Sequence, residues 1–285
     1  MLVIQARHLG MCFGVRDALE TMRNLPYPET VTVHGELVHN PVVTEELDAR
    51  GFHRQSEDER HAAPSTDKVL ITAHGVSNTA RKELESQGYE LIDTTCPLVK
   101  RVHKAALHYH DKGYFLVVIG RRGHVEVEGL TGDLVNFVVV SHPDQVRTYQ
   151  ERRIAVVNQT TTRPDEVEEF HRRVVRNNSQ AEVKLVDTTC RPPRERQDSV
   201  VELVRRVQGL VVVGGANSNN TLQLGLKAQE HGIPWWRVAT AQELRPEWFE
   251  NIRVIGLTAG TSTTDETVRE VAVALRKIKP GKLSA

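Results

Sequence analysis

Leu91-Ile-Asp-Thr-Thr-Cys96 recurs later in the chain as Leu185-Val-Asp-Thr-Thr-Cys190. A strand-like run precedes each cysteine, and a helix-like run follows it. The third cysteine of this 285-residue chain ends a looser version of the phrase, Arg7-His-Leu-Gly-Met-Cys12. Because all three thiols stand at equivalent points of a repeat, the sequence predicts three similar lobes that each offer one thiolate to a common centre.

Apolar runs rich in β-formers alternate with amphipathic helical stretches, and this rhythm predicts parallel sheets flanked by helices. Continuously apolar runs such as Phe115-Leu-Val-Val-Ile119 are typical of parallel strands covered on both faces. We expect strands at residues 2–5, 31–33, 69–72, 90–92, 115–119, 137–140, 154–157, 183–186, 210–213 and 254–257. We expect helices to begin near Val15, Asn40, Asn78, Leu98, Glu126, Asp165, Glu195, Thr221 and Asp265.

The repeat also sets the expected lobe boundaries. They are residues 13–95, residues 96–189, and residues 190–285 together with 1–12, so that the N-terminal strand completes the last lobe and closes the chain into a ring of three. The polar stretch 54–66 is expected to be a surface loop. The predicted fold class is therefore α/β, with three similar lobes built on mostly parallel sheets.

Charge and cysteine usage exclude several classes of protein. The 37 Lys and Arg residues balance the 37 Asp and Glu residues, so the overall charge indicates neither a nucleic-acid nor a membrane partner. The first residues read as a strand and not as a secretory signal. We expect the cytoplasm, where disulfides are rare, and the odd number of cysteines also argues against a disulfide framework.

Six loops rich in small and polar residues follow predicted strands, at residues 35–41, 73–77, 120–126, 158–162, 214–221 and 258–262. Ligands of parallel α/β sheets bind at such carboxyl ends. The loops contain three histidines beside glycine or asparagine and a set of hydroxyls and amides: His39, His74, His124, Thr160, Ser218, Asn219, Asn220 and Ser262. None is a phosphate-binding Walker loop, and no Asp-Asp-x-x-Asp motif is present. The set suits a diphosphate held without a metal bridge, although a single histidine is often structural and Ser262 could simply cap a helix.

The cysteines allow three interpretations. A single cysteine is most often an inert buried thiol. Zinc sites usually contain a close pair such as C-x-x-C, which is missing here. A four-iron cluster normally takes four thiolates, so three would leave one iron open to substrate as a Lewis acid.

Taken in order, the motifs resemble the 4-hydroxy-3-methylbut-2-enyl diphosphate reductase (LytB) family over nearly the whole chain. The matching segments are Gly10-Met-Cys12, Val38-His39-Asn40-Pro41, Ala73-His74-Gly75-Val76, Thr95-Cys96-Pro97, Gly123-His124-Val-Glu126, Gln159-Thr160-Thr161, Thr189-Cys190, Asn217-Ser218-Asn219-Asn220-Thr221 and Ala259-Gly-Thr-Ser262. Any one of these is weak evidence, whereas nine in order are specific.

The resemblance implies a trefoil of three lobes around a central [4Fe-4S] cluster, with Cys12, Cys96 and Cys190 as its ligands and one open iron. It implies that the diphosphate is held by His39, His74, His124, Ser218, Asn219, Asn220 and Ser262. Thr160 would hydrogen-bond the substrate near its hydroxyl group, and Glu126 would supply or relay the proton, with His124 beside it. Ferredoxin or flavodoxin would donate the electrons. The products would be isopentenyl and dimethylallyl diphosphate of the non-mevalonate isoprenoid pathway.

Two alternatives remain. A paralogue could keep the cluster and reduce another allylic diphosphate, since Arg191-Pro192-Pro193, Asn219 and Leu222-Gln223 depart from the family's usual residues. A cluster-based redox sensor without turnover would not need Glu126, Thr160 and the anion-binding set together.

Overall fold

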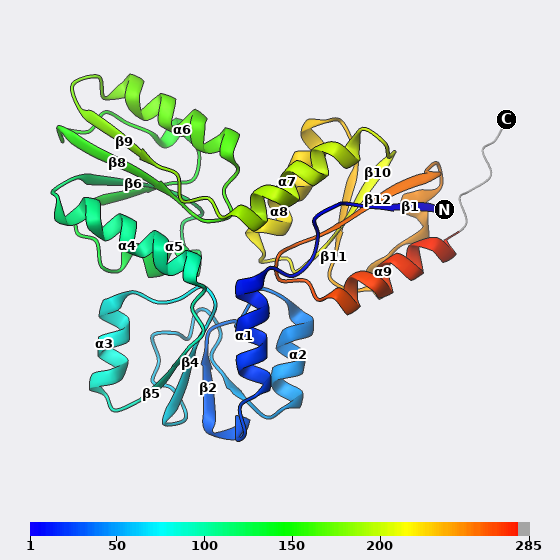
Figure 1. Cartoon of the computed structure of the whole chain (residues 1–285), viewed down its shortest axis with the longest axis horizontal. Coiled ribbons are helices and arrows are strands. Elements are labelled where there is room, and N and C mark those ends of the chain that lie inside the picture. Colours follow the sequence, from blue (N-terminus) through cyan, green and yellow to red (C-terminus); the bar gives the residue numbers. More distant parts are fainter. Residues whose placement is uncertain (279–285) are drawn as a thin grey trace. The chain divides into compact units, whose positions relative to one another are not determined.

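The computed structural model describes residues 1–278, and Figure 1 labels their helices and strands. Within these residues the strands form three sheets of four strands, in the orders β1-β12-β10-β11, β3-β2-β4-β5 and β7-β6-β8-β9. Every pair of neighbouring strands in the three sheets runs parallel. The prediction of an α/β protein with three parallel-sheet lobes is confirmed.

One sheet joins the two ends of the chain, because the N-terminal strand pairs with the last one. Its strands and helices are β1 (Leu2–Gln5), β10 (Gly209–Val213), β11 (Trp235–Val238), β12 (Val254–Ala259), α7 (Arg191–Val204), α8 (Asn219–Glu230) and α9 (Asp265–Lys277). Alternate residues of β10 face opposite layers: Val211 packs in the cluster that includes α9, whereas Leu210 packs with α7 and α8. Both faces are thus buried, as a parallel sheet requires.

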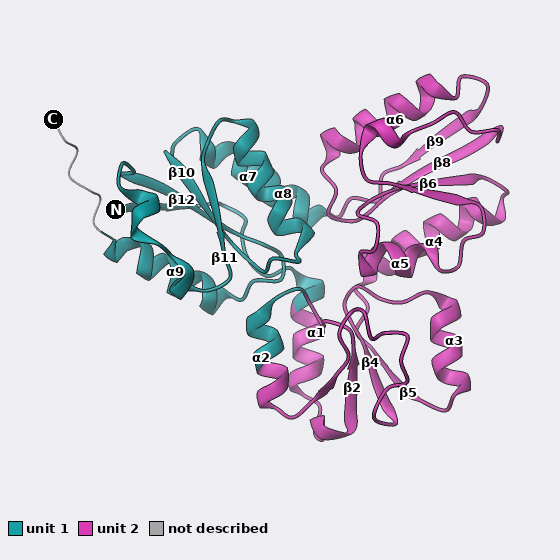
Figure 2. Cartoon of the chain, turned by 180° about the vertical axis from the view of Figure 1, so that it is seen from behind, with its two compact units in different colours: residues 1–15, 39–45, 191–285 teal, residues 16–38, 46–190 magenta. Residues whose placement is uncertain are grey.

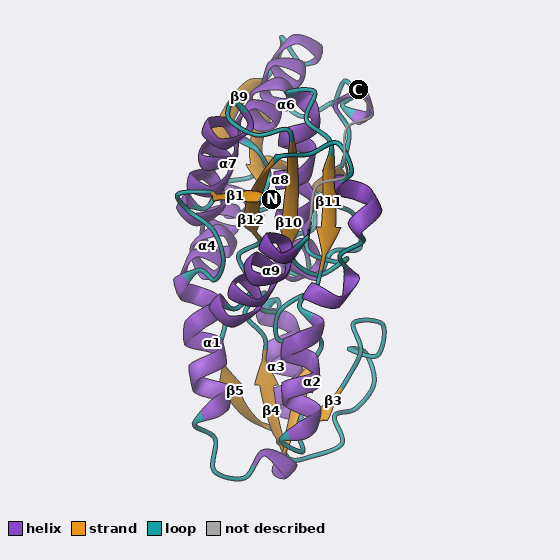
Figure 3. Ribbon diagram, turned by 90° about the vertical axis from the view of Figure 1, so that its right-hand side faces the viewer, coloured by secondary structure: helices purple, strands orange, loops and turns teal. Residues whose placement is uncertain are grey.

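A second sheet follows in sequence. Its elements are α1 (Phe13–Arg23), β2 (Val31–His34), α2 (Pro41–Ala49), β3 (His53–Arg54), β4 (Lys68–Ile71), α3 (Asn78–Ser86) and β5 (Glu90–Asp93). Residues 55–67 form the loop expected from their polarity (Figure 3). The loop is nevertheless fastened to the sheet, because Gln55 is buried and its side-chain oxygen lies 2.8 Å from His34 Nδ1.

The third sheet has helices on both faces. Its elements are α4 (Pro97–Asp111), β6 (Phe115–Ile119), α5 (Val125–Thr131), β7 (Phe137–Val140), β8 (Arg153–Asn158), α6 (Pro164–Asn177) and β9 (Glu182–Val186). In Figure 1, α4 and α5 cover one face and α6 the other. Accordingly Leu116 packs in the cluster with residues of α4 and α5, and Val117 in the cluster with Phe170 of α6.

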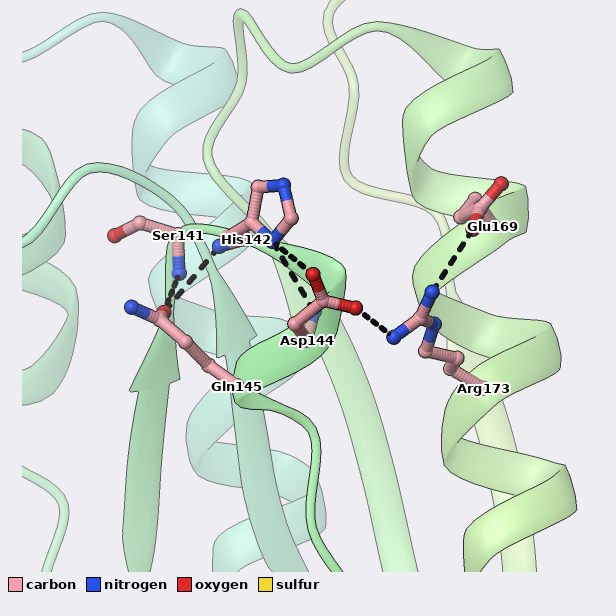
Figure 4. A network of polar contacts seen from close by, with 6 residues as sticks. All are labelled: Ser141, His142, Asp144, Gln145, Glu169 and Arg173. Atoms are coloured by element: carbon pink, nitrogen blue, oxygen red, sulfur yellow. Dashed lines mark hydrogen bonds and ion pairs between the residues drawn. The ribbon is translucent and has the colours of Figure 1, made fainter.

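A surface network fastens the end of β7 to α6 (Figure 4). The Gln145 side chain accepts from the Ser141 and His142 backbones at 2.7 and 3.3 Å. Arg173 of α6 pairs with Asp144, and with Glu169 at 3.7 Å. All these groups are at least partly exposed, so the network contributes little to stability.

By contacts the chain divides into two compact units, coloured separately in Figure 2. Unit 1 comprises residues 1–15, 39–45 and 191–285, and unit 2 comprises residues 16–38 and 46–190. The three lobe boundaries drawn from the repeat stay a prediction.

The structure departs from the predicted elements in three places. It adds β3 and β11, for which no strand was predicted. It also begins α7 at Arg191, whereas the sequence predicted a start near Glu195. That prediction was wrong because prolines are tolerated in the first helical turn, where a backbone N–H has no helical partner.

Candidate functional site

Each cysteine lies directly before a helix. Cys12, Cys96 and Cys190 precede the first residues of α1, α4 and α7. All three are half-buried, and none is in a disulfide. The N-terminus of a helix carries partial positive charge and stabilises a thiolate. The three thiols therefore share one chemical setting in three lobes.

The backbone of each cysteine is also fastened in one way. Its N–H donates to the carbonyl of the second residue after the end of a neighbouring strand: β12, β4 or β8. The bonds run from Cys12 to Thr261 at 3.0 Å, from Cys96 to Ala73 at 3.1 Å, and from Cys190 to Thr160 at 2.8 Å. The repeat equivalence predicted for Cys12 from a loose match is thus present in its hydrogen bonding.

The repeated aspartates shape the turns before two of the cysteines. Oδ1 of Asp93 accepts from the Thr95 backbone at 2.9 Å, and Oδ1 of Asp187 accepts from Thr189 at 3.0 Å. A short side-chain acceptor of this kind closes a turn that would otherwise leave an N–H unpaired. Both aspartates of the repeated phrase therefore satisfy backbone groups at the turn before their cysteine.

Two cationic side chains also pair with Asp93. Its Oδ2 lies 2.7 Å from Arg81 Nη2 and 2.7 Å from Lys100 Nζ. Burial by itself would raise the pKa of Asp93, but hydrogen bonds from Lys100 and Thr95 and the charge of Arg81 lower it to about 2. The turn before Cys96 is therefore held by an ionised carboxylate.

The donor set fits an iron–sulfur cluster. Thiolates are the ligands such clusters take, and each cysteine here lies directly before a helix N-terminus. Within residues 1–278, no three His, Cys, Asp or Glu side chains are grouped as ligands of one metal ion. A cluster does not require that grouping, because each thiolate binds a different iron.

Arg196 fastens the turn before Cys12. Its side chain is 6% exposed and donates to the Gly10, Met11 and Pro192 carbonyls. Burial lowers the pKa of Arg196, and the negative charges of a Cys12 thiolate and of Glu195 oppose that shift. This role was not predicted from the sequence, since an arginine in a polar helix usually faces solvent.

In unit 1 the structure brings together two of the predicted polar loops. Asn40 Nδ2 donates to the Ser262 carbonyl at 2.7 Å, and Ser262 Oγ donates to the His39 carbonyl at 3.3 Å. The Ser262 hydroxyl proton is therefore used inside the protein, and Asn40 appears as a positioning residue beside the predicted His39. The motif Val38-His39-Asn40-Pro41 contained that signal.

The start of α8 is a polar cradle. Ser218 Oγ accepts from the Thr221 backbone at 3.2 Å, so the Ser218 hydroxyl proton remains available to a ligand. Asn219 and Asn220 are the first residues of the helix and are buried. Neither polar atom of the Asn220 side chain has a hydrogen-bond partner, although the residue is only 2% exposed. A buried carboxamide seldom stays unpaired, so this cradle is built for a polar ligand.

In unit 2 the predicted Glu126 and Thr160 form a buried pair. Glu126 Oε1 accepts from the Thr160 backbone at 2.6 Å, and Glu126 Oε2 accepts from Thr160 Oγ1 at 3.0 Å. Both residues are about 95% buried. Two donors hold the carboxylate in one orientation, and the Thr160 oxygen keeps lone pairs for a substrate hydroxyl.

The histidines of unit 2 lie beside this pair. His124 Nδ1 accepts from the Glu126 backbone N–H at 3.1 Å. An Nδ1 that accepts leaves the ring proton on Nε2, so that Nε2 is a donor atom. The His74 and His124 rings meet edge to face with centroids 5.8 Å apart.

The predicted residues thus form two sets. Unit 1 holds Cys12, His39, Ser218, Asn219, Asn220 and Ser262, and unit 2 holds His74, Cys96, His124, Glu126, Thr160 and Cys190. No helix in the described part of the chain has the length and apolar character to cross a bilayer.

Comparison with known proteins gives consistent matches. The family model described as LytB protein matches residues 3–276. A 4-hydroxy-3-methylbut-2-enyl diphosphate reductase from Methylibium petroleiphilum is 36% identical, covering 97% of this chain and 85% of that protein. The enzyme of the same name from Aquifex aeolicus is 33% identical, with 99% and 98% covered.

Two solved structures are similar to this chain. The E-1-hydroxy-2-methyl-but-2-enyl-4-diphosphate reductase from Plasmodium falciparum has a TM-score of 0.86 at 23% identity, covering 97% of this chain and 88% of that one, and it bears on the fold alone. A structure of (E)-4-hydroxy-3-methyl-but-2-enyl diphosphate reductase, described as the terminal enzyme of the non-mevalonate pathway, has a TM-score of 0.67 at 31% identity, with 98% and 100% covered.

Proposed function

Because this chain belongs to the LytB protein family, we propose that it is a 4-hydroxy-3-methylbut-2-enyl diphosphate reductase of the non-mevalonate isoprenoid pathway. The reaction consumes two electrons and two protons. The allylic hydroxyl leaves as water with one proton, and a carbon takes the other, which gives isopentenyl or dimethylallyl diphosphate. We expect the reaction to take place in the cytoplasm, with ferredoxin or flavodoxin as electron donor.

The family implies an iron–sulfur cluster, and the proposed ligands are Cys12, Cys96 and Cys190. Their matching positions before α1, α4 and α7 support this assignment. When bound, a [4Fe-4S] cluster with three cysteine ligands supplies electrons and, at its open iron, a Lewis acid. The protein's own residues supply the remaining tasks of binding, orientation and proton delivery.

The diphosphate is assigned to histidine, hydroxyl and amide donors. The proposed set is His39, His74, His124, Ser218, Asn219, Asn220 and Ser262. The unpaired carboxamide of Asn220 and the helix N-terminus at α8 support anion binding in unit 1. The Nε2 proton of His124 supports it in unit 2. The Ser262 hydroxyl donates to the His39 carbonyl and the Ser262 carbonyl accepts from Asn40, so Ser262 also positions this part of the set.

Proton delivery is assigned to Glu126 and Thr160, and this buried pair is the observation that carries the proposal. A protonated Glu126 would pass its proton towards Thr160 Oγ1, 3.0 Å away, and Thr160 would pass one to the leaving hydroxyl. Hydroxide is a poor leaving group, so a positioned acid should accelerate its loss by about a hundredfold or more. His124 orients the carboxylate's helix through the Glu126 N–H.

Turnover of purified protein would test the proposal. Anaerobic reconstitution with iron and sulfide should give a protein that converts 4-hydroxy-3-methylbut-2-enyl diphosphate with reduced methyl viologen. A loaded cluster without product would overturn the proposed function and leave the sensor alternative. Faster turnover of a different allylic diphosphate would identify a paralogue.

Glu126→Gln should bind substrate normally but lower kcat by about two orders of magnitude, because the amide cannot donate the acid proton. Glu128→Gln is the matched control, since Glu128 lies on the same helix and is exposed. Equal rates for the two variants would remove Glu126 from the mechanism.

A further inference from the structure

A pocket of about 300 Å³ opens beside Cys12 in unit 1. Cys12 and Phe13 line it together with residues from the loop after β1 and from the start of α7. The Cys12 thiol is half-buried, so this proposed cluster ligand faces a recess of the surface. None of the substrate-binding residues assigned above is among those that line the pocket.

Two arginine side chains and one carboxylate line the pocket. Arg7 is exposed at its rim, and the buried Arg196 forms part of its wall. Among the described residues that line it, Glu195 is the only acid, and its carboxylate already lies 2.6 Å from Arg191 Nε. Arg191, which is 86% exposed, balances Glu195 and leaves Arg7 and Arg196 as the positive charges that line the pocket.

An apolar group lies within this rim. Phe13 follows Cys12 directly, lines the pocket, and is 46% exposed. An aromatic side chain surrounded by polar and charged residues is the usual anatomy of a docking surface between proteins. Arginine charges at such a rim attract a partner of opposite charge and orient its approach.

We propose that this pocket is the docking site of an acidic one-electron carrier protein, and that electrons enter the site through Cys12. The inference rests on the proposed reductase function. Each turnover would oxidise two reduced carriers by one electron apiece, and those two electrons reduce one substrate. Of the three proposed ligands, Cys12 is the one that lines this pocket.

Two substitutions with opposite effects test the site in the reconstituted holoenzyme, with a reduced plant-type ferredoxin and a reduced flavodoxin as probes. Arg7→Glu should raise the KM for the carrier about tenfold, and Glu195→Gln should lower it about threefold. The dissociation constant of the oxidised carrier, measured by calorimetry, should change in the same directions as KM. Turnover with reduced methyl viologen should stay unchanged in both variants, because a small reductant needs no protein surface.

Arg172→Glu is the matched control, since Arg172 is an exposed arginine of α6 that does not line the pocket. The docking site would be refuted if Arg7→Glu and Arg172→Glu changed the carrier's KM and dissociation constant equally. It would also be refuted if neither variant changed them. If Arg7→Glu lowers iron content, Glu195→Gln decides alone, because it keeps every proposed ligand and removes only a rim charge. If the wild-type protein did not turn over substrate with reduced methyl viologen, that result would instead refute the reductase function.

Discussion

Replacing Arg196 with methionine tests whether a buried guanidinium holds the turn before Cys12. The guanidinium donates to the Gly10 carbonyl from Nε at 2.9 Å and from Nη2 at 2.5 Å. It also donates to Met11 at 3.3 Å and to Pro192 at 2.9 Å. Methionine fills part of the same space but donates nothing.

The expected loss of stability follows from the backbone carbonyls that Arg196→Met leaves without a donor. The Pro192 carbonyl lies in the first turn of α7 and has a helical donor, so we count only Gly10 and Met11. A buried carbonyl without a donor costs about 1–3 kcal/mol. The neighbouring pocket lets water reach Met11, so we take the lower end of the range for it. Together the two carbonyls should lower the free energy of unfolding by about 2–4 kcal/mol.

Urea unfolding of the reduced protein without its cluster measures this loss directly. Arg173→Met is the matched control, because Arg173 has the same side chain in exposed ion pairs and its loss should cost about 0–1 kcal/mol. Arg196→Met should also bind less iron per chain on reconstitution, whereas Arg173→Met should not. Equal unfolding midpoints and equal iron contents for the two variants would refute the reasoning.

Three further predictions concern single groups of the site and its turns. Thr160→Val should keep substrate affinity but lower kcat with methyl viologen at least about tenfold, since valine matches the shape of threonine without its hydroxyl; Thr161→Val is the control, and equal kcat values would exclude a role for Oγ1. Asn220→Asp should raise the KM for substrate by about tenfold to a hundredfold, because it sets a carboxylate against the diphosphate; an unchanged KM would remove Asn220 from the anion site. Asp93 has its pKa lowered to about 2 when folded, so its contribution is present above the unfolded value and is lost as pH falls towards 2; unfolding of Asp93→Asn should therefore depend less on pH between 4 and 2, and parallel pH profiles would contradict this.

The sheets were predictable from sequence because their strands are long apolar runs with few alternatives. β10 is wholly buried, and residues 210–213 of it were predicted as a strand from their apolar run alone. β11 was missed because Trp235 and Trp236 are only half-buried and Arg237 is exposed, as befits an edge strand. β3 has two exposed residues, so only its pairing with β2 defines it.

The candidate site was predictable where chemistry sits on short sequence motifs. Glu126 and Thr160 lie far apart in sequence, yet each belongs to a polar loop after a parallel strand, and such loops gather at one edge of a sheet. Arg196 was not predictable in the same way. Its acceptors are the backbone carbonyls of Gly10 and Met11, far from Arg196 in the sequence. Every residue has a backbone carbonyl, so no residue type marks these acceptors.

Arg196 also accounts for the loose form of the repeat at Cys12. Asp93 and Asp187 stand three residues before Cys96 and Cys190 and fasten those turns from within by accepting a backbone N–H. Leu9 occupies the equivalent position before Cys12 and cannot do so. There the turn is fastened from outside, because Arg196 donates to its carbonyls, while the Cys12 N–H keeps the bond to Thr261 that matches the other lobes. The same cysteine position is thus maintained by an internal acceptor in two lobes and by an external donor in the third.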